Sequence, residues 1–223
     1  MKNLILIPTK RELTAFIKRT DADGFKSVKL AVGEYDALQF PDFHLVIARG
    51  GLGKAQFAVQ TQYFIDRLPE LKVVICAGAA GSLLDNAAVG DIVVATETIE
   101  HDIRSYTGNV MPRFQPEALL LQQFESFKSK KKKYAIHFGP VASGDEDVMA
   151  DKRKIEVKKQ TGAIAVAWEG AGGARACRFS KIPYIEVRTI SDAADDNAST
   201  DFFKNLDDAM GNLAELILEW AGS

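Results

Sequence analysis

The sequence predicts an α/β fold: a single domain over residues 1–223, with a central, twisted, mainly parallel (mixed) sheet flanked by helices. Strand-like and helix-like patterns alternate from one end of the chain to the other, which is typical of this fold class. Several strand-like segments are continuous apolar runs, as expected for strands that helices cover on both faces. With 223 residues, of which 47% are hydrophobic and 26% charged, the chain can also bury one large core.

Seven segments have the density of apolar and β-branched residues that predicts a strand. They are residues 4–7, 45–48, 73–77, 92–96, 134–141, 164–166 and 184–190. Between them, apolar residues three and four positions apart predict amphipathic helices, most clearly at 55–68 and 201–220. A helix is also expected at 117–127, and two more are expected to open at Pro8 and after Glu169.

The charge and hydropathy of the chain argue against several classes of partner. The net charge is −2 and the isoelectric point is near 6.0, so the chain lacks the basic field that attracts nucleic acid or an anionic membrane. We interpret the one basic run, residues 128–133, as a solvated turn. No segment reaches the roughly 18 to 20 apolar residues that span a bilayer, and the N-terminal apolar run is too short for a signal peptide. We therefore expect a cytoplasmic protein.

Cysteine, histidine and glycine usage predicts no metal and no cofactor. Cys76 falls in an apolar strand and Cys177 on a predicted helix, with no CxxC pair, so both are expected to be buried, reduced thiols. The three histidines, His44, His101 and His137, are dispersed rather than spaced as metal ligands. The glycine-rich segments complete neither the GxGxxG nor the GxxxxGK[ST] phosphate-binding pattern.

Acidic residues and glycines follow the predicted strands at their carboxyl ends. In a parallel α/β sheet these ends share one edge, where ligands bind. Glu12, Glu169 and Asp192 come after three strands, and segments 49–54 and 77–82 are expected to be loops almost without bulky side chains. Taken singly, each acid could be a helix cap, a first-turn helix acid or a loop residue. Three such acids at one edge instead predict a ligand site.

These residues resemble the nucleoside phosphorylase and nucleosidase superfamily, and most closely the 5′-methylthioadenosine/S-adenosylhomocysteine nucleosidases. The likeness covers nearly the whole chain in the same order and implies a nucleoside phosphorylase-like fold. Its most specific part is Val187-Arg-Thr-Ile-Ser-Asp-Ala-Ala-Asp195, followed by Asp201-Phe-Phe203. The other matching segments are Glu12 at a helix start, Gly51-Leu-Gly-Lys54, Ala77-Gly-Ala-Ala-Gly-Ser-Leu83, Val89-Gly-Asp-Ile-Val-Val94, Ser143-Gly-Asp145 and Trp168-Glu-Gly-Ala171.

For activity, the resemblance implies hydrolysis of the N-glycosidic bond of a purine nucleoside, a step of methionine salvage. The acid that matches Asp192 donates a proton toward N7 of the base, and Ser191 would orient it. The acid that matches Glu12 activates the attacking water, helped by the residue that matches Arg188. The glutamate that matches Glu169 binds the ribose hydroxyls.

The chemistry of the reaction is consistent with these roles. A purine leaves poorly as an anion, so the reaction needs a general acid at the base and a general base at the water, each worth about 10²- to 10⁴-fold in rate. Desolvation at the end of an apolar strand is expected to raise the pKa of Asp192, which helps this carboxyl to keep a proton near neutral pH.

The resemblance also implies further substrate contacts, with departures from the family pattern. Asp147 stands where these nucleosidases usually place an aromatic residue, Trp168 where they usually have methionine, and Ala167 replaces a common glutamate. Ala79 takes the place of a hydroxyl residue. The base and the 5′ substituent are therefore left open. The other residues expected in the substrate pocket are Gly81 and Val148, with Leu52 and Phe202 as apolar contacts for a 5′ substituent.

Water is favoured over phosphate as the nucleophile. Residues 7–12 place a glutamate where the phosphorylases of the family carry a glycine-rich loop with an arginine, and a phosphate dianion beside Glu12 would be repelled. The alternatives are a hydrolase for another purine nucleoside such as futalosine, a phosphate-dependent phosphorylase, and a nucleoside-binding protein without turnover. Because nucleosidases of this family are usually homodimers whose partner closes the 5′ end of the pocket, a homodimer is also expected.

Overall fold

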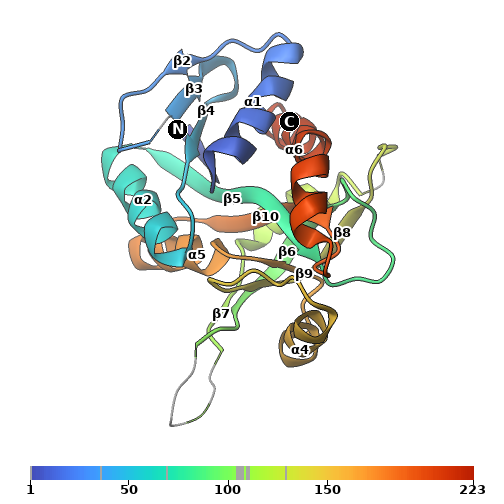
Figure 1. Ribbon diagram of the computed structural model, residues 1–223. Helices are drawn as coiled ribbons and strands as arrows, with labels where there is room; N and C mark the ends of the chain where they lie inside the picture. The colour runs from blue at the N-terminus through green and yellow to red at the C-terminus, as the bar shows by residue number, and fades with distance from the viewer. Residues whose placement is uncertain (1, 36, 69, 104–107, 109–110, 129) are drawn as a thin grey trace.

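Strands and helices alternate along the chain in the computed structural model, which describes residues 2–35, 37–68, 70–103, 108, 111–128 and 130–223 (Figure 1). The strands are β1 (Lys2–Ile7), β2 (Val28–Lys29), β3 (Ala37–Phe40), β4 (Leu45–Arg49), β5 (Leu71–Ser82), β6 (Ile92–Glu100), β7 (Arg113–Phe114), β8 (Ile136–Ser143), β9 (Ala165–Ala167) and β10 (Tyr184–Asp192). The helices are α1 (Lys10–Ala22), α2 (Lys54–Arg67), α3 (Ala118–Glu125), α4 (Asp151–Thr161), α5 (Gly170–Ser180) and α6 (Ala198–Ala221), with a short 3₁₀ helix η1 (Pro41–Phe43).

All of these strands belong to one mixed sheet, in the order β10-β6-β8-β9-β5-β1-β4-β3-β2, with β7 beside β6. The strands β1, β4, β5 and β10 pair in parallel with one another, as do β6, β8 and β9. Antiparallel contacts join these two groups, between β10 and β6 and between β5 and β9. Because β10 also pairs with β5, the strands β5, β10, β6, β8 and β9 form a closed circuit. The predicted mixed α/β fold is confirmed.

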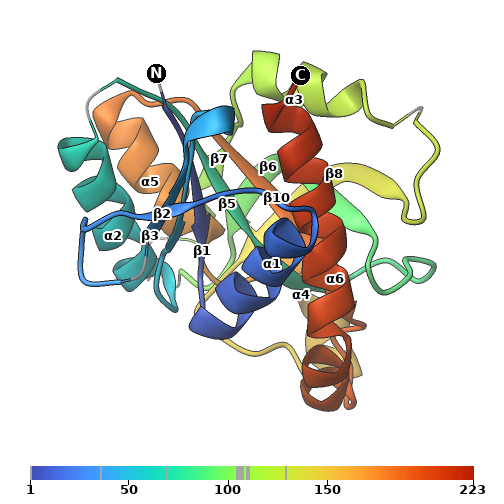
Figure 2. The same cartoon turned by 90° about the horizontal axis from the view of Figure 1, so that it is seen from above.

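Helices cover both faces of the β1 region, as the alternation of side chains along a strand requires. Ile5 and Ile7 of β1 belong to the core cluster that includes residues of α1 and α6. Leu4 and Leu6, one position out of phase, belong to the cluster formed with α2 and α5. Figure 2 shows the two helix pairs on opposite sides of the sheet. A strand buried on both faces accounts for the continuous apolar run in the sequence.

The closed circuit of strands is filled mainly by small side chains. Ala80, Ala95, Ala165 and Ala167 pack there with β-branched residues of β6, β8 and β10. Small residues are needed because the inward side chains of several strands must share a narrow interior.

One predicted loop is a strand. Residues 77–82 were expected to follow the third strand as a loop, but β5 continues without a break to Ser82. The reason is its neighbours: β10 pairs with β5 as far as Gly81, and β9 pairs with Gly81 and Ser82. The glycine- and alanine-rich segment 77–82 is therefore the carboxyl-terminal part of a strand at the edge of the sheet, not a loop.

The remaining expectations about the surface and the thiols agree with the structure. Lys130 and Lys132 of the basic run form ion pairs with Glu219 and Glu215 on α6, so part of its charge is neutralised. Both cysteines are free and buried. Within the described ranges, the helices are too short or too polar to cross a bilayer.

Candidate active site

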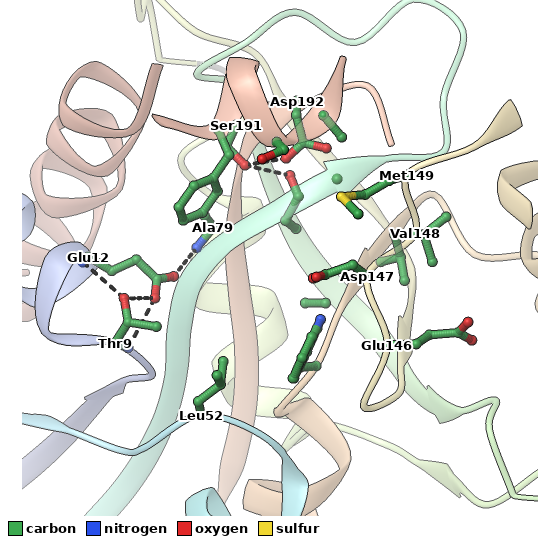
Figure 3. Close-up of a pocket in the computed structure, with 18 of the residues that line it drawn as sticks. Thr9, Glu12, Leu52, Ala79, Glu146, Asp147, Val148, Met149, Ser191 and Asp192 are labelled. Carbon is green, nitrogen blue, oxygen red and sulfur yellow. Dashed lines mark hydrogen bonds between the residues drawn. The ribbon is translucent and has the colours of Figure 1, made fainter. Parts of the chain in front are cut away.

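A cavity of about 350 Å³ lies at the carboxyl ends of β1, β5, β9 and β10 (Figure 3). This volume is in the range of pockets that hold small molecules. Every residue predicted for the site lines the cavity except Arg188. They are Glu12, Leu52, Ala79, Gly81, Asp147, Val148, Trp168, Glu169, Ser191, Asp192 and Phe202.

Glu12 is held at the start of α1 by a capping box, in which the N-cap residue and the third helical residue bond to each other. The Thr9 hydroxyl and the Thr9 backbone N–H both donate to Glu12 Oε2, at 2.6 and 3.0 Å. The Ala79 backbone N–H donates to Glu12 Oε1 at 2.9 Å. An ionised carboxylate has about four acceptor positions. Three are filled, so one position on Oε1 stays open.

Asp192 is the last residue of β10, and burial raises the pKa of its carboxyl, as the sequence predicted. Hydrogen bonds from the Ser191 hydroxyl to Oδ2 (2.7 Å) and from the Ala194 N–H to Oδ1 (2.9 Å) act in the opposite direction. Ser191 Oγ also lies 3.3 Å from the carbonyl oxygen of Ala80. Since a hydroxyl has one proton, Ser191 can donate to Asp192 or turn to Ala80 when Asp192 is protonated.

Glu169 precedes α5 and is buried, and its side chain makes no capping bond to that helix. Burial raises its pKa to about 7, and the nearby charge of Glu12 adds to this increase. The charge of Arg188 and the Gly53 N–H, 3.4 Å from Glu169 Oε1, act against it. Near neutral pH, Glu169 is therefore divided between its protonated and ionised forms.

Arg188 lies behind the cavity instead of lining it. Its side chain is 1% exposed, and Nη2 is 3.3 Å from Glu169 Oε2. A Cβ on Gly78, the residue opposite Arg188 in β5, would be 2.8 Å from Glu12 Oε1 and 2.9 Å from Arg188 Nη1. The missing side chain of Gly78 thus lets the carboxylate and the guanidinium approach each other. The help to the attacking water that is expected of Arg188 stays a prediction.

The predicted substrate residues differ in how far they are enclosed. Trp168 is half-buried, and Val148 is buried. Asp147 is exposed at the cavity and has no hydrogen-bond partner among the residues that the structure describes. Leu52 is 57% exposed, so the apolar side of the cavity is open to solvent.

Other lining residues were not predicted: Thr9, Ala80, Glu146, Met149, Val166, Ala167, Ala198, Ser199 and Phe203. Thr9 had a detectable signal, because Thr9-Lys-Arg-Glu12 matches the S/T-x-x-E capping box. Ala167 was noted only as a departure from the family pattern. Ala80 and Val166 lie in segments that were predicted at strand ends, next to residues that were named, and the others come from segments whose position relative to the strand ends the pattern does not predict.

The Ser143-Gly-Asp145 segment builds the site without lining it. Ser143 Oγ donates to the carbonyl oxygen of Trp168 (2.6 Å) and accepts from the Ala171 N–H (2.9 Å), which holds the turn that carries Glu169. Asp145 Oδ1 accepts from the backbone N–H of Lys54 at the start of α2 (2.8 Å). These hydrogen bonds therefore hold the N-terminal ends of α5 and α2 against the carboxyl end of β8.

The ionisable lining of the cavity is entirely acidic. Among the described residues that line it, five carry carboxyl groups and none is lysine or arginine: Glu12, Glu146, Asp147, Glu169 and Asp192. Fold and cavity together define a class: an α/β protein with a cavity of small-molecule size whose ionisable lining groups are carboxyls.

The family is shown by comparison with known proteins. The family model described as the phosphorylase superfamily matches residues 4–220, and the chain belongs to this superfamily. It is similar to the 5′-methylthioadenosine/S-adenosylhomocysteine nucleosidase of Buchnera aphidicola, with 30% identity over 80% of each protein.

Solved structures have the same fold. The nucleosidase of the same name from Neisseria meningitidis, in complex with methylthio-immucillin-A, is 27% identical, with a TM-score of 0.86 over 99% of this chain and 98% of that one. Futalosine hydrolase of Helicobacter pylori is 22% identical, with a TM-score of 0.87 over 100% of this chain and 97% of that one, which shows the fold alone.

Proposed function

We propose that this chain hydrolyses the N-glycosidic bond of a purine nucleoside of the 5′-methylthioadenosine or S-adenosylhomocysteine type, releasing the free base and a ribose sugar. The observation that carries the proposal is the presence in one cavity of two complementary carboxyl groups. Asp192 has a raised pKa, and Glu12 has an open acceptor position. The nucleosidase relatives support the substrate class.

In this mechanism Asp192 is the general acid. Its carboxyl donates a proton to N7 of the purine as the C1′–N9 bond breaks, so that the bonding electron pair leaves with a neutral base. The Ser191 hydroxyl, freed from Asp192 Oδ2 while that oxygen is protonated, turns to the Ala80 carbonyl. The sugar is left as an oxocarbenium ion.

Glu12 is the general base. A water molecule at the open position of Glu12 Oε1 attacks C1′ and passes a proton to the carboxylate. Thr9 and the Ala79 N–H fix the carboxylate, which limits the number of orientations that the water can take. Asp192 ends the cycle ionised and Glu12 protonated, and exchange with solvent restores both.

Glu169 binds the ribose hydroxyls in its ionised form. A carboxylate that accepts hydrogen bonds from these hydroxyls stabilises the positive charge that develops on the sugar. Arg188 acts from behind, by holding Glu169, and is a positioning residue. Phosphate is disfavoured as the nucleophile because no lysine or arginine among the described lining residues can balance its charge.

Product analysis tests the proposal. Methylthioadenosine, adenosylhomocysteine, adenosine, inosine and futalosine would each be incubated with the protein, with and without phosphate. We expect free adenine and free sugar from the 5′-thio nucleosides at rates independent of phosphate. Strict phosphate dependence with a sugar 1-phosphate product would identify a phosphorylase, preferential cleavage of futalosine would change the substrate, and binding without cleavage would identify a non-catalytic binding protein.

We also propose a homodimer in which the partner covers the open side of the cavity. Leu52, Met149 and Phe203 line the cavity and are 57%, 45% and 59% exposed, which is a large apolar exposure for a substrate site. Light scattering on the purified protein would give the mass. A monomer that cleaves 5′-thio nucleosides at full rate would exclude this role for a partner.

For its location we propose the cytoplasm. Two free, buried thiols are expected in a reducing compartment. Release of a methylthioribose sugar there would supply methionine salvage. Fractionation of the source cells would test the location.

A further inference from the structure

A second buried carboxyl group lies behind the candidate active site and takes no part in the mechanism above. Glu186 is 0% exposed, in the middle of β10. It is two positions before Arg188, so the two side chains point to the same face of the strand. Arg188 Nε donates to Glu186 Oε1 at 2.8 Å, and the Thr98 hydroxyl of β6 donates to Glu186 Oε2 at 2.6 Å.

The fold makes specific room for this carboxylate. Gly170 begins α5 directly after Glu169, and a Cβ there would lie 2.1 Å from Glu186 Oε2. A glycine is present because any side chain would displace the Glu186 carboxylate.

Glu186 and Glu169 share a single cation. The guanidinium of Arg188 contacts both acids, and all three side chains are buried. Two ionised acids with one cation would leave a net negative charge in a region without solvent, which is costly. The acid with the poorer hydrogen bonds should therefore take up a proton first.

Hydrogen-bond distances identify that acid as Glu169. Glu186 receives bonds of 2.8 and 2.6 Å, whereas Glu169 receives bonds of 3.3 Å from Arg188 and 3.4 Å from the Gly53 N–H. The raised pKa of Glu169, about 7, agrees with this order. The other ionisable groups that interact with Glu169 or with its cation are Glu12 of α1, Cys76 of β5 and Tyr184 of β10.

We propose that Glu186 is a positioning residue for the candidate active site: it fixes the Arg188 guanidinium and shares its charge, so that Glu169 receives only part of that charge. The inference deepens the proposed function, on which its consequence for catalysis rests. Glu186 thereby sets the pH at which Glu169 becomes a carboxylate able to bind the ribose hydroxyls.

Replacement by glutamine tests this role with little change of shape. In Glu186→Gln, the amide oxygen can still accept from Arg188 and the amide nitrogen can donate to Thr98 Oγ1. Only the negative charge is removed. Arg188 then has one acid partner, and the repulsion from Glu186 is gone, so both effects lower the pKa of Glu169. We expect a downward shift of about 1 unit or more.

The primary readout needs no turnover. Carbon-13 NMR of labelled glutamate carboxyls would follow the titration, with Glu169→Gln identifying the Glu169 signal. Glu97→Gln is the control for net charge: Glu97 precedes Thr98 in β6, but its carboxylate is bound by Arg113 and Gln115, outside this cluster. We expect the Glu169 signal to titrate near 7 in the wild type and in the control, and at lower pH in Glu186→Gln.

Each outcome decides the inference. A Glu169 signal that titrates at the same pH in Glu186→Gln and in the wild type would overturn it. So would titration near 4.5 in the wild type, a result that does not require a Glu186 variant to fold. If Glu186→Gln does not fold, Glu186→Asp, which retains the charge but reaches less far toward Arg188, should shift the titration in the same direction by less.

The catalytic readout separates this inference from the proposed function. With methylthioadenosine, the acidic limb of the pH profile of kcat/KM should move to lower pH in Glu186→Gln and stay unchanged in Glu97→Gln. If no nucleoside is cleaved, the proposed function fails, while the NMR titration still decides the role of Glu186. A lower rate without a shift of the limb would indicate a merely structural role.

Discussion

Glu12 combines a structural and a chemical position. It closes the capping box of α1 and also faces the cavity with one free acceptor position. The sequence left two interpretations of Glu12 open, a first-turn helix acid and a residue of the site. Its position agrees with both. A helix cap suits a catalytic base because the bonds from Thr9 fix the carboxylate before substrate binds.

Removing either proposed proton-transfer group should lower turnover and spare binding. We expect Asp192→Asn and Glu12→Gln each to reduce kcat by about 10²- to 10⁴-fold. Neither change alters the shape of the cavity lining, so the Kd of the intact nucleoside, measured by calorimetry, should change little. Wild-type turnover in either variant would disprove the role assigned to that residue.

We expect the negative charge of Asp147 to influence which nucleosides the protein prefers. Its carboxylate is exposed at the cavity without a partner in the described part of the chain, and the other ionisable lining residues are acids as well. We expect Asp147→Asn to lower kcat/KM for 5′-amino-5′-deoxyadenosine by about fivefold, the effect of one charge contact in water. The neutral methylthioadenosine is the matched control, and an equal loss for both would contradict charge selection.

At the scale of elements, most segments with a clear apolar pattern were predictable, whereas three short strands and the polar helix α4 were not. The seven predicted strands and the helices α2, α3 and α6 all exist, but β5 and β6 continue to Ser82 and Glu100, beyond the predicted ends at 77 and 96. The strands β2, β3 and β7 have two to four residues, too few for a periodic pattern. The end of β5 was missed because glycine and alanine have low strand propensity, and pairing with β10 overrides it.

The candidate site shows a similar division. Acids at strand ends could be predicted because the topology of parallel strands collects them at one edge. The position of Arg188 behind the cavity could not, since it depends on Gly78 leaving space in the neighbouring strand. The contact between Glu186 and Arg188 did have a signal, the period of two along a strand, but a glutamate in an apolar run has no obvious partner until the fold is known.

The junction of α5 and α2 should be sensitive to a single methyl group. A Cβ on Gly172 of α5 would lie 2.2 Å from the backbone oxygen of Lys54 in α2. We expect Gly172→Ala to destabilise the protein by about 1–3 kcal/mol, because the helices must separate. Gly211→Ala on α6 is the matched control: nothing lies within 4 Å of its Cβ, and it should stabilise by up to about 1 kcal/mol.

Urea denaturation of the two glycine variants would measure both effects. If Gly211→Ala is less stable than the wild type, helix propensity does not decide the sign of the stability change at open positions of α6. Unchanged stability in Gly172→Ala would show that α2 and α5 can move apart without cost.

For the whole molecule, the buried Glu169 should make stability depend on pH. The folded protein holds a proton on Glu169 up to about pH 7, whereas an unfolded chain releases it near 4.5. The folded state thus binds more protons in this window, so the stability from this group is fully present below 4.5 and is lost as pH rises through about 7. The slope reaches at most about 1.4 kcal/mol per pH unit.

Glu169→Gln should remove this contribution. We expect the free energy of unfolding, measured between pH 4.5 and 8, to fall less with rising pH in the variant than in the wild type. Comparing the two proteins cancels the other titrating groups. Parallel curves would mean that Glu169 does not titrate in this range.

The closed circuit of strands has a consequence for the order of folding. β10 lies between β5 and β6, and it is the last strand in the chain. Until residues 184–192 have left the ribosome, both neighbours have an unpaired edge, which favours association with other chains. The proton donor proposed for the reaction lies on this strand, so activity and protection of these edges are acquired together. Pulsed hydrogen exchange should find the amides of β10 among the last to be protected.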